Sequence, residues 1–152
     1  GLSGRSPSTA SKGRKEAQAL LECLWVFEER RIPTRPLLRK VLQADEPRMR
    51  AAAIRTLGHW GTKVKDWHPT LTAGARDESA LVRAEAVKAA VSFEGLPAAE
   101  IIFEAATRPT DVELDTVIRY ARGSLNVDKI AKDAIAADGS RSWAAQTYLL
   151  QR

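Results

Sequence analysis

The sequence is poor in the residues that metal, haem and disulfide sites require. Its 152 residues include one cysteine, Cys23, and two histidines, His59 and His68. A lone cysteine excludes a disulfide framework, a cysteine-based zinc finger and the Cys-x-x-Cys-His attachment of a c-type haem. Two histidines and one cysteine scattered along the chain do not form a spaced metal-ligand set. We therefore expect neither a metal nor a cofactor.

Long apolar runs are also missing, and so are the short motifs of the common enzyme classes. No stretch of about 18 apolar residues could cross a bilayer, so we expect no membrane insertion by this segment. The chain contains no Gly-rich phosphate loop, no Gly-x-Ser-x-Gly and no His-Glu-x-x-His. Its carboxylates fall mostly beside Lys or Arg, as they do in surface pairs. The sequence therefore predicts no catalytic residues and a protein that is not an enzyme.

Positive charge is concentrated at the start of the chain. Residues 1–15 hold four basic and no acidic side chains, residues 16–76 eleven and seven, and residues 77–152 nine and twelve. Residues 1–14 are also rich in Gly and Ser and have no apolar period, which predicts a disordered basic tail. The folded domain is expected over 15–152. Because this body is almost neutral, a solubilising tail is favoured over a nucleic-acid footprint, which needs several phosphate contacts.

Apolar residues recur at steps of three and four, which is the period of an amphipathic helix. Nothing alternates with period two over a stretch long enough for a strand. The pattern predicts an all-α protein. The expected helices cover residues 15–31, 36–42, 48–60, 65–76, 80–93, 96–107, 111–125, 127–137 and 141–150.

The chain also repeats itself at a fixed interval. Residues 45–57 (DEPRMRAAAIRTL) resemble residues 77–90 (DESALVRAEAVKAA), with an offset of 33 between Arg50 and Arg83. A fainter copy over residues 109–120 lies 32 positions further on. Two helices per period of this length predict an α-solenoid, because one hairpin alone cannot bury its apolar face. We expect four to five hairpins in a right-handed superhelical stack.

In each of the two clear copies an Asp precedes an Arg by five or six residues. The two clear pairs are Asp45 with Arg50 and Asp77 with Arg83. This spacing is similar to that of HEAT repeats, in which the Asp meets backbone amides and the Arg reaches a neighbouring unit. We expect these four residues to form a structural ladder. The third copy has Asp115 at the arginine position, so the ladder should stop there.

The repeats resemble bacterial short HEAT repeats over about residues 16–125. Residues 20–25, 50–60, 82–90 and 108–111 are also similar to a HEAT segment of large bacterial membrane-bound dehydrogenase-like, haem-binding proteins. In that family a β-propeller precedes the array and a cytochrome c domain follows it, and this sequence contains neither. The resemblance implies a spacer or docking segment of a larger redox protein in the periplasm or another extracytoplasmic compartment. Without the resemblance, the expected compartment is the cytoplasm.

An α-solenoid presents an extended concave surface, here lined by the second helix of each unit. We expect this surface to bind a protein partner or a neighbouring domain of the same polypeptide, with the chain itself a monomer. The exposed residues expected there lean towards the basic, which would suit an acidic segment. The candidate residues are Arg48, Arg55, Trp60, Trp67, Lys88, Arg119 and Arg122.

Two readings of the aromatic residues remain open. Trp60 and Trp67 bracket a turn, where they either contribute to a binding surface or pack together to close the hairpin, and the second is the simpler expectation. Cys23, Trp25 and Trp143 lie among apolar helical positions, which predicts that they belong to the core.

A second function class is a nucleic-acid binder related to alkylpurine DNA glycosylases, which also use a HEAT-like fold. Those enzymes place aromatic side chains and an acidic residue in a basic groove, and Trp60, Trp67 and Asp66 superficially fit that description. The almost neutral body and the lack of any further motif make this the less favoured hypothesis.

Overall fold

The computed structural model describes residues 7–136, which contain eight α-helices, one short 3-10 helix and no strand. The prediction of an all-α protein is confirmed. Most of the predicted helices begin and end within three residues of the observed ones. The elements are α1 (Pro7–Glu29), α2 (Arg35–Leu42), α3 (Pro47–Trp60), η1 (Gly61–Lys63), α4 (Trp67–Ala75), α5 (Ala80–Ala90), α6 (Leu96–Ala105), α7 (Val112–Ser124) and α8 (Val127–Ala136).

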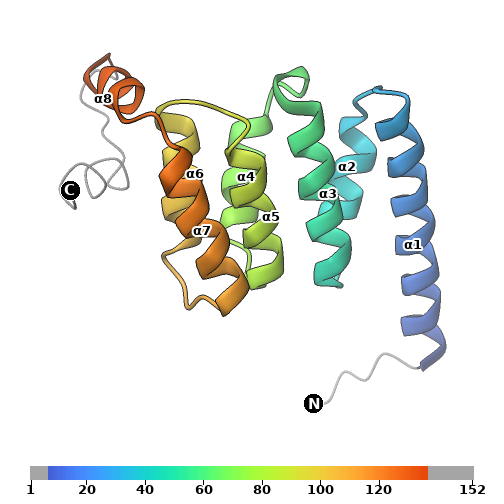
Figure 1. Ribbon diagram of the computed structural model, residues 1–152. Coiled ribbons are helices and arrows are strands. Elements are labelled where there is room, and N and C mark those ends of the chain that lie inside the picture. The colour runs from blue at the N-terminus through green and yellow to red at the C-terminus, as the bar shows by residue number, and fades with distance from the viewer. Residues whose placement is uncertain (1–6, 137–152) are drawn as a thin grey trace.

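The helices form two layers (Figure 1). In one layer α1, α3, α5 and α7 pack against one another in that order. In the other, α4, α6 and α8 follow in order, and α2 packs against α1 and α3. The pairs α2/α3, α4/α5 and α6/α7 are therefore stacked hairpins, and α1 and α8 flank them. The helix predicted over 141–150, with Trp143, lies outside the described residues.

Helix α1 begins earlier than the sequence predicted. It starts at Pro7, so the prediction of a disordered tail was wrong for residues 7–14. Pro suits the first turn of a helix, and the Ala, Lys and Arg residues that follow favour helix. The side chains of residues 9–16 are all exposed, which explains why this stretch carries no apolar period.

Small residues allow α3 to approach its neighbours closely. A Cβ atom on Gly58 would lie 2.8 Å from the Cβ of Ala89 on α5. A Cβ atom on Gly74 of α4 would lie 2.6 Å from Cδ1 of Ile54. Neither position can therefore hold a larger side chain than that of glycine unless a neighbouring side chain or helix shifts. The core is centred on α3 and α5, where eight residues of each helix are buried.

The end helix α1 buries much less of its surface. Leu21 and Leu24 face the core and are at most 5% exposed. Trp25 is 45% exposed and Cys23 is exposed, so the prediction that both belong to the core was wrong. Successive helical residues are about 100° apart, and a helix at the end of a stack has a neighbour on fewer sides. The side chain of Trp25, one residue after the buried Leu24, therefore points towards solvent.

Candidate interaction surface

Arg50 links two consecutive hairpins. Its Nε and Nη2 donate to the carboxylate of Asp77 at 2.8 and 2.9 Å. Its Nη1 donates to the backbone carbonyls of Ala44 and Asp45, each at 2.9 Å. The Asp77 carboxylate in turn accepts from the N–H of Ser79 at 2.9 Å. One guanidinium thereby ties the turn before α3 to the turn before α5.

The Arg50–Asp77 pair is largely shielded from water, with side chains only 12% and 15% exposed. Burial raises the pKa of Asp77, but the hydrogen bonds from Arg50 and Ser79 and the charge of Arg50 outweigh it. The pKa of Asp77 therefore lies below its ordinary value. The hydrogen bond to Asp77 raises the pKa of Arg50. Both groups are charged at neutral pH, as a ladder of charged side chains requires.

Arg83 occupies the equivalent position in the next hairpin and makes different contacts. Its Nη1 donates to the carbonyl of Ala105 at 3.3 Å and its Nη2 to the carbonyl of Pro109 at 2.7 Å. Asp111, the acidic residue at this turn, instead caps α7 by accepting from the N–H of Leu114 at 2.8 Å. The arginine still connects one hairpin to the next, through carbonyls in place of a carboxylate.

Two of the candidate basic residues are joined by one carboxylate. Glu85 of α5, whose side chain is 8% exposed, lies 3.2 Å from Nε of Arg55 and 3.1 Å from Nζ of Lys88. Lys88 also lies 3.7 Å from Glu113 of α7. These ion pairs cross from α3 to α5 and on to α7. The exposed face of these helices is therefore less basic than the sequence suggested.

The other three candidate arginines are exposed on α3 and α7. Within residues 7–136, no carboxylate forms an ion pair with Arg48, Arg119 or Arg122. The guanidinium carbon of Arg122 lies 5.7 Å from the ring centroid of Phe103, within reach of a cation–π contact. Arg48 and Arg119 therefore keep their charge available to a partner.

The tryptophans around the turn before α4 are engaged inside the fold. Trp60 is only 4% exposed, so its assignment to a partner-binding surface was wrong. The ring of Trp67 stacks on Phe93 with centroids 3.8 Å apart and planes at 4°. Trp60 therefore offers no free ring to a ligand, and one face of the half-buried Trp67 ring is covered by Phe93.

Asp66, the acidic residue of the same turn, is also engaged. Its carboxylate accepts from Arg35 at 2.7 Å and from Arg39 at 3.2 Å. The hydrogen bond from Arg35 contributes most to a pKa of Asp66 below its ordinary value, although burial opposes it. The carboxylate therefore joins α2 to the start of α4.

The two histidines lie in different layers, each beside a carboxylate. His59 Nδ1 contacts Glu28 of α1, whose other carboxylate oxygen accepts from the hydroxyl of Thr56 at 2.6 Å. His68 Nε2 lies 3.3 Å from Glu100 of α6. No group of three or more His, Cys, Asp or Glu side chains in the described part of the chain is placed to hold a metal.

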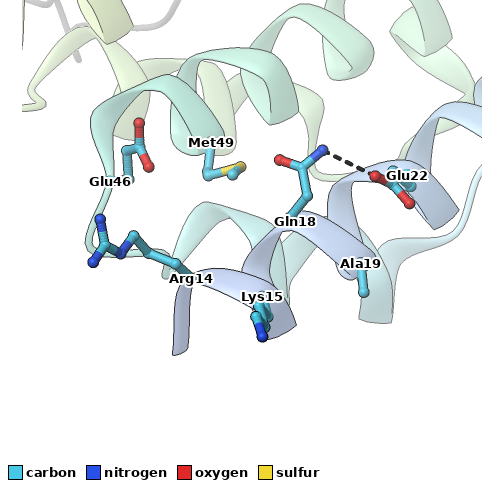
Figure 2. Close-up of a pocket in the computed structure, with 7 residues that line it drawn as sticks. All are labelled: Arg14, Lys15, Gln18, Ala19, Glu22, Glu46 and Met49. Carbon is cyan, nitrogen blue, oxygen red and sulfur yellow. Dashed lines mark hydrogen bonds between the residues drawn. The ribbon is translucent and has the colours of Figure 1, made fainter. Parts of the chain in front are cut away.

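An open groove between α1 and α3 was missed by the sequence reasoning. Its first cleft, about 440 Å³, is drawn in Figure 2, where Arg14 and Glu46 lie at one end and Gln18 and Glu22 at the other. A second cleft of about 420 Å³ continues along the same two helices. It is lined by Trp25, Glu28, Glu29, Ala52, Arg55, Thr56 and His59. We call these two clefts together the α1–α3 groove.

No helix described over residues 7–136 is both long enough and apolar enough to cross a membrane. A two-layer stack of hairpins, tied from unit to unit by Arg50 and Arg83, defines an α-solenoid of helical repeats. The family model for HEAT repeats matches residues 34–121, more than half of the sequence. The chain belongs to the HEAT-repeat family, whose members generally serve as protein-interaction or scaffold modules. Comparisons with curated proteins and with solved structures found no match.

Proposed function

We propose that this chain is a non-catalytic docking module that holds a protein partner, or a neighbouring domain of the same polypeptide, on the exposed face of α1, α3, α5 and α7. The α1–α3 groove is the observation that carries the proposal. Elsewhere on this face ion pairs bridge the helices, as between Lys88 of α5 and Glu113 of α7, whereas the groove leaves Trp25 almost half exposed. An exposed aromatic side chain in a cleft is typical of protein-binding surfaces.

Cross-linking in the source cells tests the docking function. A lysine-reactive reagent should join Lys15 and Lys88, which lie on the exposed face of α1 and α5, to another polypeptide or to a distant domain. Lys132 on α8 is exposed on a different part of the molecule and serves as the matched control. Cross-links spread evenly over all three lysines would contradict a dedicated docking face.

We further propose that the module is a spacer or docking segment of a larger bacterial redox protein in an extracytoplasmic compartment, with the isolated chain a monomer. The resemblance of residues 20–25, 50–60, 82–90 and 108–111 to a HEAT segment of dehydrogenase-like haem proteins supports this. An antibody against the chain, used with a haem stain, should detect a large haem-positive band. A haem-free band near 16.7 kDa would instead identify a free-standing adaptor.

Nucleic-acid binding is the competing function, and the basic first half of the chain is its main support. Trp60, Trp67 and Asp66 do not favour it, because all three are engaged within the fold. Titration of the chain with duplex DNA over a range of salt concentrations separates the two functions. Submicromolar binding with a steep salt dependence, retained without residues 1–6, would replace the docking proposal.

A further inference from the structure

We propose that the α1–α3 groove binds a basic amphipathic helix of a partner protein, with an Arg or Lys side chain over the ring of Trp25. This inference rests on the docking function proposed above and adds the place and the chemistry of the contact. The geometry of the groove, its apolar floor and its charge each support it.

The two clefts follow one another along α1 and α3. The α1 wall of the groove follows steps of three or four residues, so these side chains share one helical face. An α-helix rises 1.5 Å per residue, so the fifteen steps from Arg14 to Glu29 span about 22 Å, or roughly four turns. That length suits a short helix laid along the groove. The residues that line the two clefts are Arg14, Lys15, Gln18, Ala19, Glu22, Trp25, Glu28 and Glu29 on α1, Glu46 just before α3, and Met49, Ala52, Arg55, Thr56 and His59 on α3.

The side chains that α1 turns to the core are larger than those that meet at the α3–α5 contact. Leu21 and Leu24 pack into the core beneath α1, whereas Gly58 meets Ala89 at the α3–α5 contact. The floor of the groove is apolar, since Met49 and Ala52 are 8% and 7% exposed. Apolar side chains of a bound helix would cover this floor and part of Trp25.

Trp25 has carboxylates on both sides along the same helical face. Glu22 precedes it by three residues and Glu29 follows it by four, and both are exposed. Within the described part of the chain, neither carboxylate forms an ion pair. An indole face attracts a guanidinium or ammonium group, and flanking carboxylates can accept its hydrogen bonds. This arrangement is complementary to a cationic side chain.

The charged side chains along the whole groove also favour a positively charged ligand, although the chain as a whole is basic. Four carboxylates line it, against Arg14, Lys15 and Arg55. Arg55 already pairs with Glu85 of α5, and Glu28 already contacts His59, which leaves three carboxylates against two basic side chains. Acidic side chains are thus in excess. A basic segment is favoured there, whereas an acidic peptide or a phosphate backbone is disfavoured.

Selection from a displayed library of random 16-residue peptides, with the full chain as target, tests the inference. Selected peptides should share an Arg or Lys among apolar residues spaced by three or four. Fluorescence anisotropy then compares their affinity for the wild-type chain, for Trp25→Ala and for the double variant Glu22→Gln/Glu29→Gln. Tyr120→Ala on α7 is the matched control, because this aromatic side chain is 74% exposed and far along the stack.

We expect Trp25→Ala to weaken peptide binding about tenfold and the double variant about threefold or more, with less than a twofold change for Tyr120→Ala. Circular dichroism should show equal helix content in all variants, since every substituted side chain is exposed. Peptides that lack a basic residue, or that bind Trp25→Ala as tightly as the wild type, would overturn the inference. So would the absence of any enrichment, or preferential binding of duplex DNA in the groove. The cross-linking experiment judges the docking function independently of all these outcomes.

Discussion

Single glycines decide how closely neighbouring helices of this molecule approach. Gly58 lies where α3 meets α5, and a methyl group there would overlap the Cβ of Ala89. Gly123 on α7 is also helical, but no atom lies within 4 Å of the Cβ position. The same substitution therefore has opposite expected effects at the two positions.

Gly58→Ala should lower the free energy of unfolding by about 1–2 kcal/mol, because overpacking of the core outweighs the gain in helix propensity. Gly123→Ala should instead raise it by about 0.4–1 kcal/mol, through the smaller conformational freedom of the unfolded chain. Urea unfolding of both variants at neutral pH measures the difference. Equal stabilisation by the two substitutions would mean that α5 moves aside freely.

Asp77 makes the stability of the array depend on pH. Its pKa in the folded protein lies below the ordinary value of 3.8. A carboxylate with a lowered folded pKa stabilises the fold fully above its unfolded pKa and loses that contribution as the pH falls through its folded pKa. The interaction should therefore be intact at neutral pH and weaken in the acid range, below about pH 4.

Asp77→Asn should cost roughly 2 kcal/mol at pH 7, since it removes charged hydrogen bonds from a shielded site. The difference from the wild type should shrink as the pH falls below about 4, where the wild-type carboxylate also becomes neutral. Glu78→Gln is the control, because that side chain is 83% exposed and lies 3.7 Å from Arg50. Urea unfolding at several pH values gives the comparison, and an unchanged difference down to pH 2 would contradict the role of Asp77.

At the scale of whole helices, the apolar period predicted where most helices lie, but it did not predict how two helices pack against each other. The helices over 48–60, 80–93 and 111–125 were predictable because each carries apolar residues at helical spacing that its neighbours bury. The start of α1 was not predictable, because residues 9–16 are helical without burying any side chain. The α1–α3 groove was also not predictable, because the width of the gap between two helices depends on how these distant segments of the chain pack.

Helix α8 is tied to α6 by one carboxylate. Asp133 accepts from the N–H of Leu96 at 3.1 Å, in the first turn of α6. Gly95, at φ 74°, precedes that turn, and a Cβ there would lie 1.9 Å from the Asp133 carboxylate. The absence of a side chain at Gly95 thus allows a residue of α8 to cap α6.

Asp133→Ala should cost about 1 kcal/mol, the usual cost of losing a helix cap, and should loosen α8 more than the rest of the array. Hydrogen exchange of the α8 amides should become faster, with little change in α3. Lys132→Ala provides the comparison, since Lys132 is an exposed neighbour on the same helix. Similar exchange in both variants would show that the cap does not hold α8 in place.

Over the whole molecule, burial is greatest in the middle of the stack and least at its ends. Eight residues are buried in each of α3 and α5, three in α7 and one in α8. In a repeat array each unit is stabilised mainly by its neighbours, so the end helices should open most easily.

Native-state hydrogen exchange should therefore be slowest in α3 and α5 and progressively faster towards α1 and α8. The Arg50–Asp77 pair lies between the turns that precede α3 and α5, so Arg50→Ala should accelerate exchange in both helices together. Acceleration confined to α3 would contradict the coupling of the two units through this pair. Slowest exchange in α1 would contradict the proposed gradient of stability.

The sequence by itself determined the all-α architecture and the repeat family. The helical period and the spacing of the repeats can be read from short segments, and both recur in each unit. The sequence also placed an Asp and an Arg at matching positions of two units, and the fold brings Arg50 of one unit to Asp77 of the next. Only the tertiary structure decided that Trp60 is buried and Trp25 exposed, since both lie on apolar stripes and differ in how many neighbours surround them. The groove likewise exists only in three dimensions, because its width is set by side chains about thirty residues apart that meet across two helices.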